Sequence, residues 1–158
     1  YVYLDAHYDL GRNCDAEDIL HNGGFLGKVL EQDWVCCAVN IGGRSVTTHI
    51  NYPDTPEGFI SIPADRPVEH ILADMVALKG KTIYLSLDAD VVDPSQSPSV
   101  PCPEENGMPL ADVLTCCRWL GENCTIIGMD LTETLPSEAT ISAEQGLFSC
   151  LLAARPTP

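Results

Sequence analysis

Short apolar segments alternate with helical ones along this chain of 158 residues, and this alternation limits its fold more than any other feature. Four short runs are apolar at successive positions, which is typical of strands buried on both faces of a parallel sheet; they cover residues 1–4, 35–41, 82–87 and 125–129. Helical spacing of apolar residues predicts helices at 24–31, 68–78, 110–120 and 142–154. The sequence therefore predicts an α/β fold: a three-layer, mostly parallel sheet with helices on both faces.

Prolines and glycines mark the expected helix ends. Pro67 and Pro109 precede two of the helices, where the fixed backbone angle of proline suits a helix start. Gly80 and Gly121 are expected to close the same two helices. Residues 51–67 hold four prolines without a clear period, so we expect an ordered surface loop there.

The 158 residues are enough for a single domain. Because the chain opens on residues that already resemble a buried strand, we expect this domain (1–158) to be incomplete, with its N-terminal part missing. A chain truncated in this way would leave apolar surface and an unpaired strand edge exposed, and such surfaces recruit partners.

The charge balance narrows the choice of partners. Eight Lys and Arg residues stand against 23 Asp and Glu residues, which gives a net charge of −15. Such a surface repels phosphate groups, so we expect no nucleic acid and no anionic membrane as a partner. No apolar run approaches the length of a membrane span, and no signal segment opens the chain. Small cationic molecules and divalent metal ions are compatible with this charge.

The eight cysteines do not form the pattern of a disulfide scaffold. Two adjacent pairs, Cys36-Cys37 and Cys116-Cys117, lie inside apolar runs, and no C-x-x-C spacing occurs, which argues against a structural zinc site. We interpret the cysteines mainly as small, reduced hydrophobic residues. Reduced cysteines favour a cytoplasmic location.

Acidic residues and a histidine follow two of the predicted strands. Asp5, His7 and Asp9 come directly after the first strand, and Asp88 and Asp90 come after the third. In extended chain, alternate residues share a face, and ligands of open α/β sheets bind at the carboxyl ends of the strands. Four carboxylates at such density repel one another unless a multivalent cation is bound. Oxygen ligands with one nitrogen favour Mn²⁺, and five ligands suit two metal ions.

Three segments resemble signatures of the ureohydrolase family, which comprises arginases, agmatinases, formimidoylglutamases and their relatives. The order and spacing of the signatures agree and cover essentially the whole chain; they are Asp5-Ala6-His7-Tyr8-Asp9, Ser86-Leu87-Asp88-Ala89-Asp90-Val91-Val92-Asp93-Pro94 and Gly128-Met129-Asp130-Leu131-Thr132-Glu133. Ile41-Gly42-Gly43-Arg44 resembles a further strand-end segment of that family.

The resemblance implies a binuclear manganese hydrolase with two Mn²⁺ per site. Its metal ligands would be Asp5, His7, Asp9, Asp88 and Asp90, with Asp5 and Asp88 shared between the ions. Water activated by the two cations would attack the planar guanidinium or amidine carbon.

Two further residues receive roles from the resemblance. Glu133 would bind the cationic nitrogens of the substrate through its carboxylate. His21 resembles the family's loop histidine, which delivers a proton to the leaving amine. These two are the candidate catalytic residues. We also expect a homo-oligomer, because family members commonly form one.

This sequence departs from the family pattern at three places. The family supplies another metal-binding histidine upstream of the first signature, in a segment that this chain does not include. The usual Gly-Thr-Pro and Gly-Gly after the second signature appear as Pro101-Cys102-Pro103 and Asn106-Gly107. The small polar residues with which arginases recognise the amino acid end of arginine are absent after the first signature. An agmatine-like substrate is therefore favoured over arginine.

We accordingly expect a manganese-dependent hydrolase that cleaves a guanidino or formimidoyl C–N bond in a linear amidine and releases urea or an analogue. A second interpretation is a catalytically silent metal-binding fragment or subunit of such an enzyme. A third is a single-zinc deacetylase of related architecture, against which Asp90 and the segment around Glu133 argue. Activity with manganese separates the first two interpretations, and the metal count separates the first from the third.

Overall fold

A parallel β-sheet forms the centre of the computed structural model, which describes residues 1–10, 22–44, 56–97, 99–135, 145–146, 148–149 and 152. Its five strands lie in the order β3-β2-β1-β4-β5, and every neighbouring pair is parallel. The strands are β1 (Val2–Leu4), β2 (Ala38–Ile41), β3 (Phe59–Ile62), β4 (Thr82–Asp88) and β5 (Thr125–Thr132). Strand β1 therefore lies in the middle of this sheet, as the buried character of residues 1–4 predicts.

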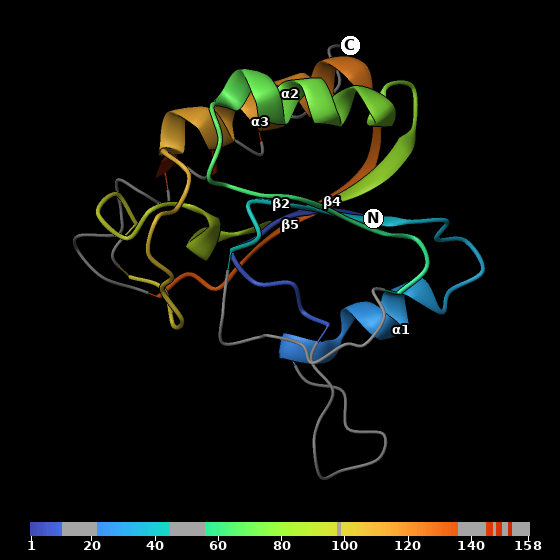
Figure 1. The fold of residues 1–158 in the computed structure, drawn as a ribbon, viewed down its shortest axis with the longest axis horizontal. Coiled ribbons are helices and arrows are strands. Elements are labelled where there is room, and N and C mark those ends of the chain that lie inside the picture. Colours follow the sequence, from blue (N-terminus) through green and yellow to red (C-terminus); the bar gives the residue numbers. More distant parts are fainter. Residues whose placement is uncertain are drawn as a thin grey trace, which may run out of the picture.

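Helices cover both faces of the sheet, which confirms the predicted three-layer α/β class. Helices α2 and α3 lie together on one face, and α1 lies on the other (Figure 1). The helices and helical turns are η1 (Asn22–Gly24), α1 (Leu26–Leu30), α2 (Val68–Met75), η2 (Val76–Leu78), η3 (Ala89–Val91) and α3 (Leu110–Asn123). None of the described helices is both long enough and apolar enough to cross a membrane.

The main core lies between the sheet and helices α2 and α3. Alternate residues of β4, among them Leu85 and Leu87, are fully buried against this layer. Ile71 of α2 and Cys116 of α3 belong to the same cluster, so this cysteine does serve as a small hydrophobic residue. Burial of each Leu or Ile side chain contributes about 1.5–3 kcal/mol. The intervening residues of β4, such as Ser86, point to the opposite face and leave it polar.

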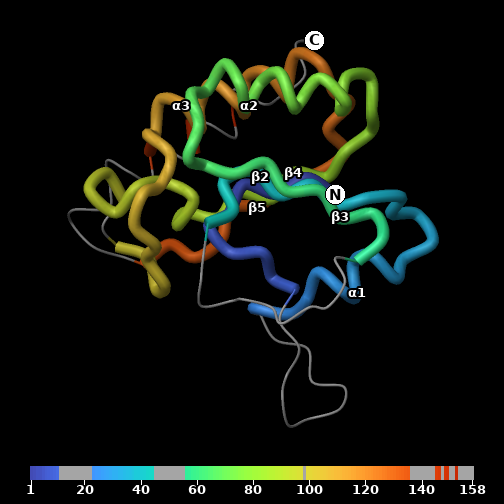
Figure 2. Tube along the Cα trace, viewed as in Figure 1, coloured from blue at the N-terminus to red at the C-terminus, as the bar shows by residue number. Residues whose placement is uncertain are grey.

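A smaller cluster lies beneath the α1 side of the sheet. Tyr3, Leu26 and Ala38 are buried there, and the Tyr1 ring stacks on Tyr3 at a centroid distance of 5.5 Å. Figure 2 shows the chain passing from α1 on this side back into β2. The clusters on the two faces hold the carboxyl ends of β1, β2 and β4 side by side.

The structure corrects two details of the prediction. Residues 51–67 were expected to form a loop, but strand β3 lies within them, between Pro56 and Pro63. This strand is short, lies at the sheet edge and leaves Ile60 half exposed, so it lacks a continuous buried pattern. Gly121 was expected to end a helix, but α3 continues through it to Asn123.

Gly80 does follow its helical segment, and its φ of +75° is the left-handed conformation that glycine favours after a helix. The predicted helix at 142–154 falls mostly outside the described residues.

Candidate metal centre

The two acidic motifs lie side by side because their strands are neighbours. Strands β1 and β4 are parallel, with Leu4 paired to Leu87, so Asp5 and Asp88 stand at adjacent strand ends. The Asp5 backbone amide donates to the Ile41 carbonyl of β2, which continues the pairing for one more residue. The predicted convergence of the motifs at the carboxyl edge of the sheet is therefore observed.

Both motifs turn sharply after the strand end, whereas the alternation of their acidic residues predicts extended chain there. The Asp5 carboxylate accepts a hydrogen bond from the His7 backbone amide at 2.6 Å. The Asp88 carboxylate accepts one from the Asp90 backbone amide at 3.0 Å, at the start of η3. Each aspartate thus closes its own turn, and residues two positions apart still face one site.

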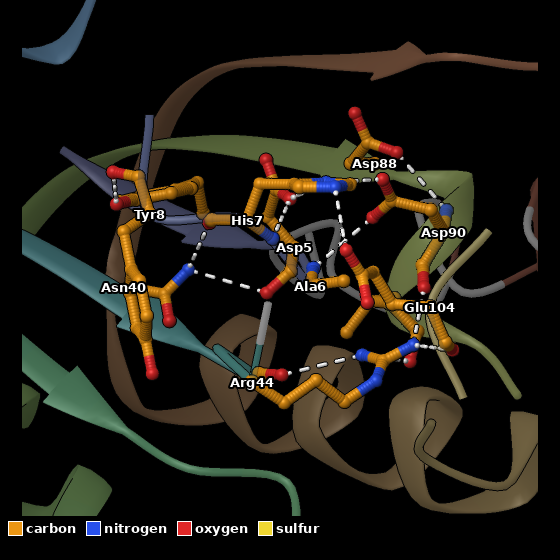
Figure 3. A network of polar contacts seen from close by, with 12 residues as sticks. Asp5, Ala6, His7, Tyr8, Asn40, Arg44, Asp88, Asp90 and Glu104 are labelled. Atoms are coloured by element: carbon orange, nitrogen blue, oxygen red, sulfur yellow. Dashed lines mark hydrogen bonds and ion pairs between the residues drawn. The ribbon is translucent and has the colours of Figure 1, made fainter. Parts of the chain in front are cut away.

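Asp5, His7 and Asp90 form the tightest group of metal-ligating side chains among the described residues. Each offers one ligand atom, and these atoms all lie within 4.8 Å of one another. The Nδ1 atom of His7 lies 2.7 Å from Asp90 Oδ2 and 3.5 Å from Asp5 Oδ1 (Figure 3). The opposite ring atom, Nε2, lies 3.5 Å from Glu104 Oε1.

Asp9 and Asp88 lie outside that triad but line the same open cavity, whose volume is about 700 Å³. Asp9 has a φ of 51°, a left-handed conformation that is uncommon for residues other than glycine and is often found at functional sites. Asp88 also accepts a hydrogen bond from the Thr132 hydroxyl at 3.1 Å. All five ligand residues predicted from the sequence therefore face one cavity.

Burial and mutual repulsion disfavour the ionised form of three of these carboxyl groups. Burial raises the pKa of Asp5 to about 6, and the Asp90 charge adds to the rise, although hydrogen bonds from His7 oppose it. Burial and the nearby Asp5 charge raise the pKa of Asp9 to about 8 and that of Asp88 to about 9. Without a cation, the site therefore retains protons that ordinary aspartates lose.

The His7 imidazole and the Asp90 carboxylate behave in the opposite way. Hydrogen bonds to Asp5 and Asp90 raise the pKa of His7 to about 11. Burial opposes ionisation of Asp90, but hydrogen bonds from His7 and from the Ala6 backbone amide outweigh it and lower the pKa of Asp90. The protonated imidazole is thus the positive charge that holds these carboxylates together.

The donor set fits a divalent cation. Seven carboxylates line the cavity, no Lys or Arg is among its described lining residues, and His7 is the one imidazole among them. A metal ion at the triad would take the place of the imidazole proton and neutralise the remaining carboxylates. Oxygen donors with one nitrogen suit Mn²⁺ better than a thiolate-selecting metal.

The two predicted catalytic residues have different outcomes. Glu133 follows β5 directly, lines the same cavity and has a φ of 55°, again left-handed. The structure therefore places Glu133 with the five predicted ligands. His21 lies outside the described residues.

Two residues at the site, Asp130 and Asn40, were not predicted from the sequence. Asp130 of β5 also lines the cavity and accepts hydrogen bonds from the Ser86 and Tyr84 hydroxyls at 2.6 and 2.8 Å. The buried amide of Asn40 in β2 donates to the carbonyls of Asp5 and His7 at 3.2 and 3.1 Å. Asp130 could have been found from the sequence, because it lies two residues before Thr132 on β5 and so shares its face of the strand. No sequence pattern indicates the contacts of Asn40.

The fold and site define an α/β protein with a carboxylate-rich candidate metal centre at the carboxyl edge of a parallel sheet. The family model "Arginase family" matches residues 1–153. The chain belongs to the arginase family.

One curated relative is the N(1)-aminopropylagmatine ureohydrolase of Thermococcus kodakarensis, with 32% identity over 140 residues, which are 84% of this chain and 45% of the relative. The chain spans about half the length of the curated relatives it matches.

Solved structures show the same fold. A hypothetical agmatinase from Burkholderia thailandensis superposes with a TM-score of 0.76 at 23% identity, over 96% of this chain and 49% of that one. A Trypanosoma cruzi formiminoglutamase with Mn²⁺ superposes with a TM-score of 0.73 at 22% identity, over 98% of this chain and 57% of that one.

Proposed function

We propose that this chain provides the metal centre of a manganese-dependent ureohydrolase. The enzyme would hydrolyse a guanidino or amidino C–N bond in a small cationic substrate, with an agmatine-like compound favoured and urea released. One observation carries this proposal: Asp5, His7, Asp9, Asp88 and Asp90 converge on one cavity from two adjacent strand ends, together with Glu133 from a third strand. Membership of the arginase family supports it.

The five converging residues would hold two Mn²⁺ ions, with Asp5 and Asp88 shared between them. Bound divalent cations supply Lewis acidity and lower the pKa of water, so that water can add to an amidine carbon near neutral pH. The name of a structural neighbour, a formiminoglutamase with Mn²⁺, supports this choice of metal.

Glu133 would bind and orient the substrate. Its carboxylate would accept hydrogen bonds from the guanidinium nitrogens and hold the planar carbon toward the metal ligands. In the reaction, water adds its oxygen to this carbon, the C–N bond to the alkyl amine breaks, and the leaving nitrogen takes up a proton. His21 would deliver that proton, because an imidazole titrates close to neutral pH.

The cavity charge favours a substrate without a carboxylate. Glu104 and Asp130 add two further carboxylates to the lining, beyond the proposed ligands and Glu133. A carboxylate on the substrate, such as that of arginine, would find no Lys or Arg among the described lining residues. An alkylamine carrying a guanidino group fits this charge, and one relative is named for such a compound, aminopropylagmatine.

The proposal is tested with the purified chain after Mn²⁺ loading. Urea release is measured with agmatine, arginine and 4-guanidinobutyrate at equal concentration, and formamide release with formimidoylglutamate. We expect the highest kcat/KM with agmatine. Activity on the carboxylate-bearing substrates alone would contradict the substrate assignment.

A catalytically silent metal-binding subunit is the second candidate. It is favoured because the match covers less than half of a relative such as the Thermococcus kodakarensis enzyme. The chain spans about half of its relatives, and His7 is the one imidazole in the described ligand cluster. This candidate predicts bound Mn²⁺ without urea release. Joining the chain to a segment homologous to the remaining half of its relatives would then restore turnover.

A further inference from the structure

Arg44 makes an unusual set of contacts just beyond the carboxyl end of β2. Its guanidinium group carries five N–H donors, and five backbone carbonyl oxygens accept from it. The Nε atom donates to Glu105 at 3.1 Å, Nη1 donates to Gly42 and Val91 at 3.3 Å each, and Nη2 donates to Asp90 at 2.7 Å and Glu104 at 2.9 Å. The side chain is half buried.

These bonds connect both metal-binding motifs. The backbone amide of Arg44 donates to the Ala6 carbonyl at 2.9 Å, between Asp5 and His7. The Ala6 amide in turn donates to Asp90 Oδ1 at 3.0 Å. Arg44 therefore contacts the first motif through its backbone and the second motif through its side chain (Figure 3).

All five acceptors of the Arg44 side chain are backbone carbonyl groups, including that of the proposed ligand Asp90. The guanidinium group binds the backbone oxygen of Asp90 rather than its carboxylate. Arg44 thus holds the Asp90 backbone, and the two carboxylate oxygens face other partners, the Ala6 amide and His7. The Oδ2 atom of Asp90 faces His7, where a cation would be bound.

Arg44 also binds the loop that carries Glu104, through the backbone carbonyls of Glu104 and Glu105. The far end of this loop is attached by a short bridge, in which the Met108 amide donates to Val91 at 2.9 Å and the Gly107 amide donates to the Asp93 carboxylate at 3.1 Å. A Cβ at Gly107 would collide with the Asp93 backbone, so the loop packs closely there. With both ends fixed, Glu104 reaches the Nε2 atom of His7 at 3.5 Å.

We propose that Arg44 is a positioning residue of the metal centre. Its side chain holds the Asp90 turn and the Glu104 loop at a fixed separation around His7, so that a metal ion meets ligands that are already oriented. The inference rests on the proposed function, because it assumes that Mn²⁺ is the ion bound. Outer partners that orient metal ligands typically change metal affinity by about 10–100-fold when they are replaced.

The test compares two conservative variants, Arg44→Lys and Arg66→Lys. A lysine keeps the charge but offers three donors and no planar fork, so at least two of the five carbonyl bonds are lost in Arg44→Lys. Arg66 is the matched control because its guanidinium pairs with Asp74 of α2, away from the cavity. Mn²⁺ affinity is measured by electron paramagnetic resonance titration without substrate, well below the unfolding temperature of each variant.

We expect Arg44→Lys to weaken Mn²⁺ binding by about 10–100-fold and Arg66→Lys to leave it unchanged. An Arg44→Lys variant that is less stable but binds Mn²⁺ as tightly as the unmodified chain would show a purely structural role and overturn the inference. Equal losses in both variants would overturn it as well.

A second measurement uses the unmodified chain, in case Arg44→Lys does not fold. Hydrogen exchange is followed at the Gly107 and Met108 amides with and without Mn²⁺. Slower exchange on metal binding supports coupling between the loop and the metal centre, and unchanged exchange contradicts it. If the chain binds Mn²⁺ but releases no urea from any amidine, the proposed activity fails while this inference stands; if it binds no Mn²⁺, both fail.

Discussion

The Nδ1 atom of His7 and the Oδ2 atom of Asp90 lie 2.7 Å apart, although the two residues belong to different strand-end motifs. This contact joins the carboxyl ends of β1 and β4 through a proton that a metal ion can replace. The same two atoms are then available as metal ligands, and the charge of a cation offsets the burial and the repulsion that raise the pKa of Asp9 and Asp88.

Replacing Asp90 by Asn is expected to lower manganese content and abolish turnover. The amide is a neutral and weaker ligand, and it no longer balances the charge of His7 or of a metal ion. Elemental analysis of the purified variant measures the metal content. Asp65→Asn, at an exposed position, is the control and should retain the metal. Unchanged occupancy in Asp90→Asn would remove Asp90 from the ligand set.

Adding Mn²⁺ is expected to stabilise the chain against unfolding. A ligand that binds only the folded state at 100 times its Kd adds about 2.7 kcal/mol to the free energy of unfolding. Thermal unfolding with increasing Mn²⁺ measures this effect, which should be strongly reduced in Asp90→Asn. A Tm that does not depend on Mn²⁺ in the unmodified chain would argue against a metal site in the folded state.

Replacing Glu133 by Gln is expected to raise KM for a guanidino substrate while leaving the metal in place. Gln keeps the shape of the side chain but loses the charge that pairs with the guanidinium group. Steady-state urea release and metal analysis on the same sample separate the two effects. Loss of metal from Glu133→Gln would indicate that Glu133 is itself a ligand.

Replacing Asn40 by Leu is expected to destabilise the fold and weaken Mn²⁺ binding together. The substitution removes the hydrogen bonds to the Asp5 and His7 carbonyls, and each buried acceptor left unpaired costs about 1–3 kcal/mol. Urea unfolding measures the stability. Asn123→Ala, which removes one hydrogen bond to Trp119 at the end of α3, is the control and should lower stability without changing Mn²⁺ affinity.

The sequence is sufficient to predict four of the five strands of the sheet but not β3. Residues 1–4 are apolar in succession and lie in the central strand β1, and the alternate residues of β4, among them Leu85 and Leu87, are buried in the main core. Strand β3 was missed because it is only four residues long, Ile60 is half exposed, and prolines flank the strand. The other edge strand, β5, was predicted from its apolar run at 125–129 although Ile127 is exposed, because no proline interrupts that run.

The convergence of the candidate ligand residues could also be predicted, because each motif is local and ends a strand that the pattern identifies. The residues that bind the backbone around them could not. Arg44 and Asn40 act through contacts with residues distant in sequence, and their acceptors are backbone carbonyls that any residue type would supply. Such contacts depend on how β2 lies beside β1 and on the path of the loop around Glu104, and neither is encoded in a short motif.

Diffraction from crystals of the chain grown with Mn²⁺, collected at the manganese absorption edge, tests the central claim most directly. The account predicts anomalous density for two ions in the cavity, one beside His7 and Asp90 and the other beside Asp9, with Asp5 and Asp88 shared between them. Density at the first position should disappear in Asp90→Asn crystals. A map without manganese in this cavity, or with manganese bound only elsewhere on the surface, would contradict the assignment.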